Sequence, residues 1–270
     1  MEEGHAHGSV HSPTRKRTAV RRLLPFSIQT NLILVILTGI LPVFLVIILS
    51  GVERRQEEIH TAETEAQRLV RHYTDQQEQV TLGVRQLLST LAMFPAVREM
   101  DAAACSALFK ELVERYPNHG NVTLLNPQGE VLASGLPFKK ANFADQWHVK
   151  EATRTLEFSP GEYLMGRLST VPIVAFAQPV LDEQGRLKAM LTTSLRLQRY
   201  VDHFTQTQLP ADSIIGMLDH TGRRLLYHPS SQYNPLGERV RPSLWAQFSG
   251  PERADIIWQK GGDGIRRVYA

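Results

Sequence analysis

The sequence contains only one cysteine, one long apolar run and no excess of charge in most of its length. Cys105 has no second cysteine to pair with, so the fold must depend on core packing rather than on an internal disulfide. The apolar run covers residues 32–49, and no similar run follows it. Residues 53–270 contain 25 basic and 25 acidic residues. This balance gives no sign of the basic surface that phosphate binding requires, and we expect no binding to nucleic acid.

The apolar run is long enough to cross a bilayer once. About 20 helical residues span the hydrocarbon layer, and we expect a transmembrane helix over residues 25–52. Five basic residues precede it, and basic residues stay on the cytoplasmic side. We therefore predict a single-pass protein in contact with membrane lipid, with residues 1–24 as a disordered cytoplasmic tail. A cleaved signal peptide is the alternative, but its apolar stretch would be only about 7–15 residues long and end in small residues.

The main domain is thus expected to lie outside the cytoplasm. An exported domain without disulfides suits the bacterial periplasm, so we place the protein in a bacterial inner membrane.

Residues 53–96 are predicted to form one long stalk helix. Apolar side chains recur at alternating steps of three and four, with one polar member, and Pro95 ends the pattern. This stripe consists of Ile59, Ala62, Ala66, Leu69, Tyr73, Gln76, Val80, Gly83, Leu87, Leu91 and Phe94. We expect the C-terminal half of this helix to pack on its own domain. For the half nearest the membrane, a parallel helix of a second copy is an equal alternative, which predicts a homodimer. A second helix is expected to begin at the capping residue Asp101.

The hydrophobic period then changes from helical to strand-like. Five strands with helices inserted after the second predict an α+β sheet module over residues 97–204. The pattern strand, turn, strand recurs over residues 213–227 with the turn at the same spacing, which predicts a second module over residues 205–270. The strands of the first module are expected at residues 122–125, 131–134, 162–168, 173–180 and 187–195, with a helix near 144–154.

The order of these features resembles the sensor region of bacterial double Cache receptors, in which two PAS-like modules follow a long helix. The likeness covers residues 30–270 and is carried by segments 142–152, 161–167 and 176–185. It implies that the membrane-distal module, 97–204, holds a small-molecule ligand. It also implies that the membrane-proximal module, 205–270, adjoins a second span and an output domain. Since the sequence ends within a predicted strand, we expect this second module to be truncated.

The resemblance also suggests where the ligand binds. Relatives that bind amino acids carry an arginine and aromatics after the aspartate at position 145 and a second aspartate on the last strand. Here Gln146, His148 and Ser194 stand at those places, which disfavours an amino acid. A guanidinium fork matches carboxylates, so an organic anion bound by Arg167 is the predicted ligand. The six candidate residues are Trp147, His148, Tyr163, Arg167, Thr192 and Ser194.

Four of the six candidates also have a purely structural interpretation. Arg167 could lie on a solvated strand face, His148 could be a satisfied polar residue of the helix, and Trp147 and Tyr163 could be core or lid residues.

No enzyme, cofactor or metal motif is evident in the sequence. Residues 261–264 resemble part of a GGDEF loop, but the glutamate and phenylalanine are missing and a tight turn explains them better. We therefore expect ligand sensing in signal transduction without catalysis, as the sensor part of a histidine kinase. The alternatives are the sensor of a diguanylate cyclase or chemoreceptor, and a membrane-anchored binding protein without signalling output.

Overall fold

The computed structural model describes residues 28–205, 209–210, 213–249, 256–260 and 264–270. The predicted tail at 1–24, the first residues of the predicted span and most of the turn at 261–264 lie outside these residues. The described residues have the predicted α+β composition, with long helices and antiparallel sheets. They divide into two compact units, residues 28–59 and the described part of 60–270.

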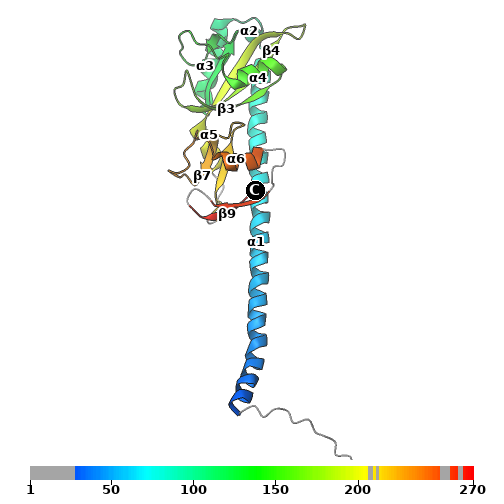
Figure 1. The fold of residues 1–270 in the computed structure, drawn as a ribbon. Helices are drawn as coiled ribbons and strands as arrows, with labels where there is room; N and C mark the ends of the chain where they lie inside the picture. The colour runs from blue at the N-terminus through cyan, green and yellow to red at the C-terminus, as the bar shows by residue number, and fades with distance from the viewer. Residues whose placement is uncertain (1–27, 206–208, 211–212, 250–255, 261–263) are drawn as a thin grey trace, which may run out of the picture. The chain divides into compact units, whose positions relative to one another are not determined.

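One helix, α1 (Ile28–Leu91), contains both the predicted span and the predicted stalk (Figure 1). It is long and apolar enough to cross a membrane, and Pro42 lies within it without ending it, as membrane helices tolerate. The helix ends at Leu91, before the end of the predicted range 53–96. Pro95 instead opens a short helix, α2 (Pro95–Arg98), because proline fits the first helical turn.

A five-stranded antiparallel sheet forms the centre of the unit at 60–270, with strand order β2-β1-β5-β4-β3. Asp101 caps the helix before this sheet, as predicted, by accepting hydrogen bonds from the N–H groups of Ala103 and Ala104 at 3.0 Å each. The elements are α3 (Ala102–Arg115), β1 (His119–Leu125), β2 (Val131–Ser134), α4 (Trp147–Thr155), β3 (Ser159–Met165), β4 (Pro172–Leu181) and β5 (Leu187–Arg196).

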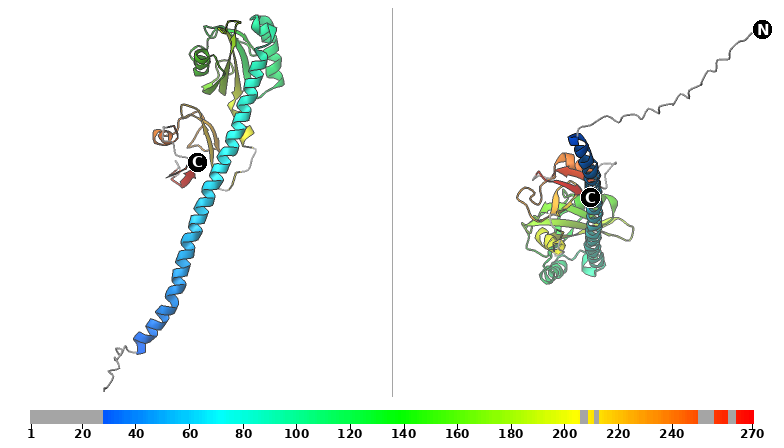
Figure 2. Two further views of the ribbon diagram at one scale, coloured as in Figure 1. Left: turned by 90° about the vertical axis from the view of Figure 1, so that its right-hand side faces the viewer. Right: turned by 90° about the horizontal axis from the view of Figure 1, so that it is seen from below.

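The first face of the sheet packs against α1 and α3. Successive strand residues point to opposite faces, and one set of alternating side chains on β1, β4 and β5 is mostly apolar, with Thr193 and Gln178 as its polar members. The C-terminal part of α1, cyan in Figure 2, lies along this face. Its buried residues are Tyr73, Val84, Leu88 and Leu91. The predicted stripe had Gly83 and Leu87 in place of Val84 and Leu88, because steps of three and four alone do not fix the register of the buried side.

The second face of the sheet is apolar at one end only. There Leu125, Ala177 and Met190 pack against Val149 and Ala152 of α4. At the other end β1 and β5 present polar side chains, while β4 contributes the apolar Ile173 and Ala175. This change of chemistry along one buried face positions the candidate site.

The remaining described residues form two hairpins and two short helices. The β6–β7 hairpin repeats the pairing of β1 and β2, as the repeated turn predicted. The helices α5 and α6, of eight residues each, were not predicted, although Leu197, Tyr200 and Phe204 of α5 recur at a helical spacing and are buried. The elements are α5 (Leu197–Phe204), β6 (Ile215–Leu218), β7 (Arg224–His228), α6 (Pro242–Ser249), β8 (Ile257–Lys260) and β9 (Arg266–Tyr269).

Candidate functional site

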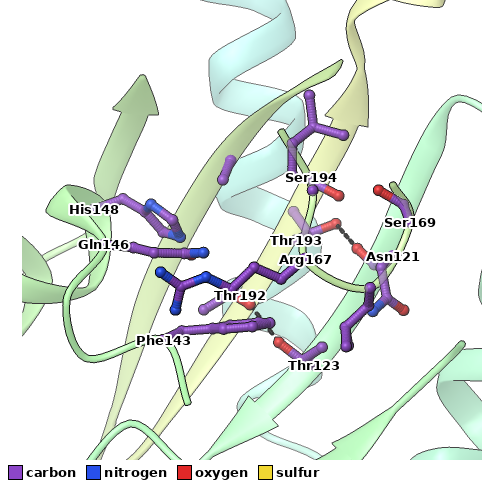
Figure 3. A pocket seen from close by; sticks show the side chains of 14 residues that line it. Asn121, Thr123, Phe143, Gln146, His148, Arg167, Ser169, Thr192, Thr193 and Ser194 are labelled. Carbon is purple, nitrogen blue, oxygen red and sulfur yellow. Dashed lines mark hydrogen bonds between the residues drawn. The ribbon is translucent and has the colours of Figure 1, made fainter. Parts of the chain in front are cut away.

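A small polar pocket lies on the second face of the sheet, between strands β1, β4 and β5 and the start of α4 (Figure 3). Its cavity measures about 30 Å³, which is room for about two water molecules. Strand alternation builds its floor, because Asn121 and Thr123 on β1 and Thr192 and Ser194 on β5 follow the period that places Leu125 and Met190 at the apolar end. All four floor residues are buried. Burying polar side chains on a strand face costs free energy unless they form hydrogen bonds.

The floor residues largely satisfy one another. The Thr123 and Thr192 hydroxyls share a short hydrogen bond across the two strands. Asn121 donates from Nδ2 to the Ser134 hydroxyl at 2.9 Å, and its Oδ1 accepts from the Leu136 N–H at 3.1 Å. The floor is therefore a fixed hydrogen-bonded surface rather than a set of free ligand donors.

His148 is different, because its ring lines the pocket without a full set of partners. Only 1% of the residue is exposed, and its Nδ1 atom has no hydrogen-bond partner among the described residues. Burial lowers the pKa of this imidazole from 6.5 to about 4. The side chain is therefore neutral near pH 7 and can donate or accept one further hydrogen bond at Nδ1, depending on its tautomer. A satisfied helix residue, the structural alternative for His148, would not leave this atom unpaired.

Arg167 lies at the mouth of the pocket, on the turn after β3, and its side chain extends toward Gln146 and His148 (Figure 3). Its guanidinium is already occupied. It makes a two-pronged ion pair with Asp145, in which Nη1 donates to Oδ1 at 2.7 Å, and Nη1 also donates to the Asn142 carbonyl at 2.6 Å. The hydrogen bonds from Arg167 lower the pKa of the Asp145 carboxyl. Thus Arg167 is not on a plain solvated face, and its guanidinium is already paired with a carboxylate of the same chain.

The mouth is held in place by its attachment to the β1–β2 turn. Asn142 donates from Nδ2 to the Gln128 carbonyl at 3.0 Å, and the Phe143 N–H donates to the Gly129 carbonyl at 2.8 Å. Gly129 permits this close approach, since a Cβ there would lie 2.6 Å from the Ala144 nitrogen. Its φ of +79° also favours glycine. The loop that carries Asp145 is therefore anchored at two points.

The structure brings four of the six sequence-predicted residues to this pocket: His148, Arg167, Thr192 and Ser194. Trp147 and Tyr163 do not line it. Trp147 instead stacks on His220 at a centroid distance of 3.9 Å, and Tyr163 packs over Gly237. Both partners lie beyond the five-stranded sheet in sequence, so these two aromatics join it to the part of the chain that contains β6 and β7.

A buried aspartate strengthens this junction. Asp219, which follows β6, accepts the Tyr163 N–H through Oδ2 at 3.0 Å. Burial opposes ionisation of this carboxyl, but backbone hydrogen bonds from Arg223 and Tyr163 hold its pKa below the ordinary value. A charged Asp219 therefore holds β3 against the β6–β7 turn.

Sequence reasoning missed five polar lining residues: Asn121, Thr123, Gln146, Ser169 and Thr193. Ser169 is notable because its Oγ is buried and has no hydrogen-bond partner among the described residues. The available signal was the pair Asn121 and Thr123, two polar residues on one face of an otherwise apolar strand. Within the described ranges no three His, Cys, Asp or Glu side chains come together to hold a metal ion.

Comparison with known proteins gives a match only at the level of structure. No protein-family model matches the chain, and no curated protein matches its sequence. The extracellular domain of a candidate histidine kinase, rpHK1S-Z16, superposes with a TM-score of 0.58 at 13% identity, covering 78% of this chain and 87% of that one. The shared fold is that of an extracellular sensor domain.

Two further structures support this assignment of the fold. A domain of a candidate sensory box/GGDEF protein from Vibrio parahaemolyticus matches with a TM-score of 0.52 at 11% identity, covering 75% of this chain and 88% of that one. The ligand-binding domain of the Campylobacter jejuni chemoreceptor Tlp3, solved with L-valine, matches with a TM-score of 0.50 at 13% identity, covering 77% and 83%. The predicted resemblance to a Cache-like sensor is confirmed at the level of the fold.

Proposed function

We propose that this chain senses a small molecule outside the cytoplasm and transmits its binding in membrane signal transduction. The observation that carries this proposal is the buried pocket, in which His148 Nδ1 lacks a partner, within a fold shared with extracellular sensor domains. An unpaired polar atom inside a protein is costly, and a ligand that supplies its hydrogen bond would remove that cost. Nothing in this function requires catalysis, a cofactor or a metal.

The location follows from charge and hydropathy. The apolar part of α1 is suited to one membrane crossing, and the basic residues before it favour a cytoplasmic N-terminus. The sheet and its pocket would then lie on the periplasmic side of a bacterial inner membrane, where the ligand arrives.

Helix α4 provides the first step of transmission. Trp147 and His148 are neighbours at its start, and one stacks on His220 while the other lines the pocket. A ligand that moves His148 must also move Trp147, because adjacent residues of a helix are rigidly connected. The ligand shifts the equilibrium only if it prefers one of two arrangements of this junction.

A histidine kinase is the proposed output, with a cyclase or a chemoreceptor as the alternatives. The histidine kinase rpHK1S-Z16 supports the first, but sensors of all three kinds share the fold. The gene sequence downstream of codon 270 tests this choice, and an in-frame kinase domain is the expected result.

Sensing itself can be tested with the full chain in detergent micelles. Trp245→Phe and Trp258→Phe leave Trp147 as the single tryptophan, so its fluorescence reports the contact with His220. A panel of small amides, polyols, carboxylates and amines is screened for a rise in Tm and a change in that fluorescence. At least one compound should produce both effects.

A pocket-filling variant provides the control. Ala175→Leu places bulk in the cavity and should abolish both effects, whereas Ala107→Leu on the exposed side of α3 should preserve them. Effects that persist in Ala175→Leu would place the ligand elsewhere. A rise in Tm without any fluorescence change would describe a binding protein that transmits nothing through Trp147.

A further inference from the structure

The pocket contains one formally charged residue among those that line it, and that charge is neutralised at the mouth. Of the 14 lining residues only Arg167 is ionised near neutral pH, since burial keeps His148 uncharged. The Arg167 guanidinium faces Asp145 with both of its terminal nitrogens. No other lysine, arginine, aspartate or glutamate lines the cavity among the described residues.

An incoming anion would have to compete with a carboxylate that is already in place. Asp145 is held near Arg167 by the anchored loop, and such a tethered group acts at an effective concentration of about millimolar or more. Displacing Asp145 would exchange one carboxylate for another and leave two negative charges close together. The guanidinium fork that makes Arg167 suitable for an organic anion is thus used within the chain.

An uncharged ligand meets no such competition. Two buried polar atoms at the pocket, His148 Nδ1 and Ser169 Oγ, have no partner among the described residues. A neutral imidazole and a hydroxyl can each donate or accept a hydrogen bond. Their complement is a small molecule with its own donor and acceptor and without net charge.

We infer that the pocket binds a small uncharged molecule bearing amide or hydroxyl groups, and that Asp145 determines this specificity by occupying Arg167. The inference rests on the proposed sensing function and replaces the organic anion predicted from the sequence. The cavity holds only about two waters as it stands, so the ligand has few heavy atoms or enters with movement of Arg167 at the mouth.

An amide and a carboxylate of the same shape differ in charge but hardly in size, so comparing them isolates the effect of the ligand's charge on binding. We would measure the Tm of the full chain in micelles with acetamide or acetate, propionamide or propionate, and lactamide or lactate. Sodium chloride at matched ionic strength is the blank for the salts. For the wild type, at least one amide should raise Tm and its carboxylate partner should not.

Asp145→Asn tests the role of the competitor. It removes the negative charge, frees the Arg167 fork and should improve the apparent affinity for the carboxylates by about tenfold. Asp182→Asn is the matched control, because Asp182 makes a similar exposed ion pair with Arg186, 2.8 Å long, on the β4–β5 turn. It should respond as the wild type does.

Ser169→Ala tests the unpaired hydroxyl without disturbing an existing bond. Its Tm without ligand should be at least that of the wild type, because the unpaired hydroxyl is itself costly, while the affinity for the active amide should fall about fivefold.

The outcomes separate the ligand class from the function. If a carboxylate raises the Tm of the wild type as much as the matching amide does, the inferred uncharged ligand class and the role of Asp145 are both wrong. The proposed sensing function would still stand. If no compound stabilises either the wild type or Asp145→Asn, both the class and the proposed pocket are wrong.

Discussion

The neutral, buried state of His148 predicts a specific loss of stability in acid. The pKa of this imidazole is about 4 in the folded chain, against an ordinary value of 6.5. A base whose pKa is lowered by folding binds its proton more readily in the unfolded chain. Its contribution to stability is therefore complete above pH 6.5 and is lost as the pH falls from 6.5 toward 4.

The size of the effect follows from the two pKa values. Proton linkage gives a loss of about 1.4 kcal/mol at pH 5.5 and about 2.5 kcal/mol at pH 4.5, both relative to pH 7.5. His148→Gln is polar but does not titrate, so it lacks this term. We expect the wild type to lose about 2.5 kcal/mol relative to His148→Gln between pH 7.5 and 4.5, whatever the difference between them at pH 7.5.

Urea unfolding of the full chain in micelles, followed by tryptophan fluorescence at several pH values, measures this difference. The comparison cancels the carboxyl groups, which titrate equally in both proteins. His60→Gln, at an exposed position of α1, controls for the loss of a histidine and should follow the wild type. If the wild type and His148→Gln lose stability in parallel, His148 is not buried in a neutral form and its place in the pocket is wrong.

Two further predictions concern the junction and the stalk. Gly237→Ala should destabilise the chain by at least about 1 kcal/mol more than Gly185→Ala in urea unfolding; both glycines have positive φ, but only the Cβ at 237 would overlap the Tyr163 ring, at 2.3 Å. Equal losses would remove Tyr163 from the junction. For the proposed homodimer, Ala62→Cys on the predicted stripe should crosslink in membranes and Thr64→Cys, off the stripe, should not; no crosslink at 62 would contradict a parallel stalk.

The sequence predicted the fold well because hydrophobic period, turn residues and caps act locally. Asp101 directly precedes an apolar helical pattern, which predicts an N-cap, and its side chain does cap α3. The β6–β7 hairpin repeated the turn spacing of the first hairpin. The predicted end of the stalk helix was wrong because proline is compatible with two positions, after the end of one helix or in the first turn of the next. Here α1 ends at Leu91 and Pro95 begins α2.

The site was harder to predict because its chemistry depends on contacts far apart in sequence. The sequence identified Arg167 as a cation with the right geometry for a carboxylate. It did not show that this carboxylate is Asp145, which lies 22 residues earlier on a different loop. Similarly, the polar period of β1 is visible in the sequence, but its partners on β5 become evident only from strand pairing.

The assignment of Trp147 illustrates the same limit and explains why α4 matters. Adjacent residues of a helix point about 100° apart, so Trp147 and His148 cannot both face one small cavity. From the sequence alone both were predicted to bind the ligand, because they are adjacent, large and compatible with a helix. Packing separates them: His148 faces the sheet, and Trp147 faces His220. The two residues therefore belong to two surfaces of one short helix, so any ligand-induced rotation of α4 at the pocket must also change the stack on the β6–β7 turn.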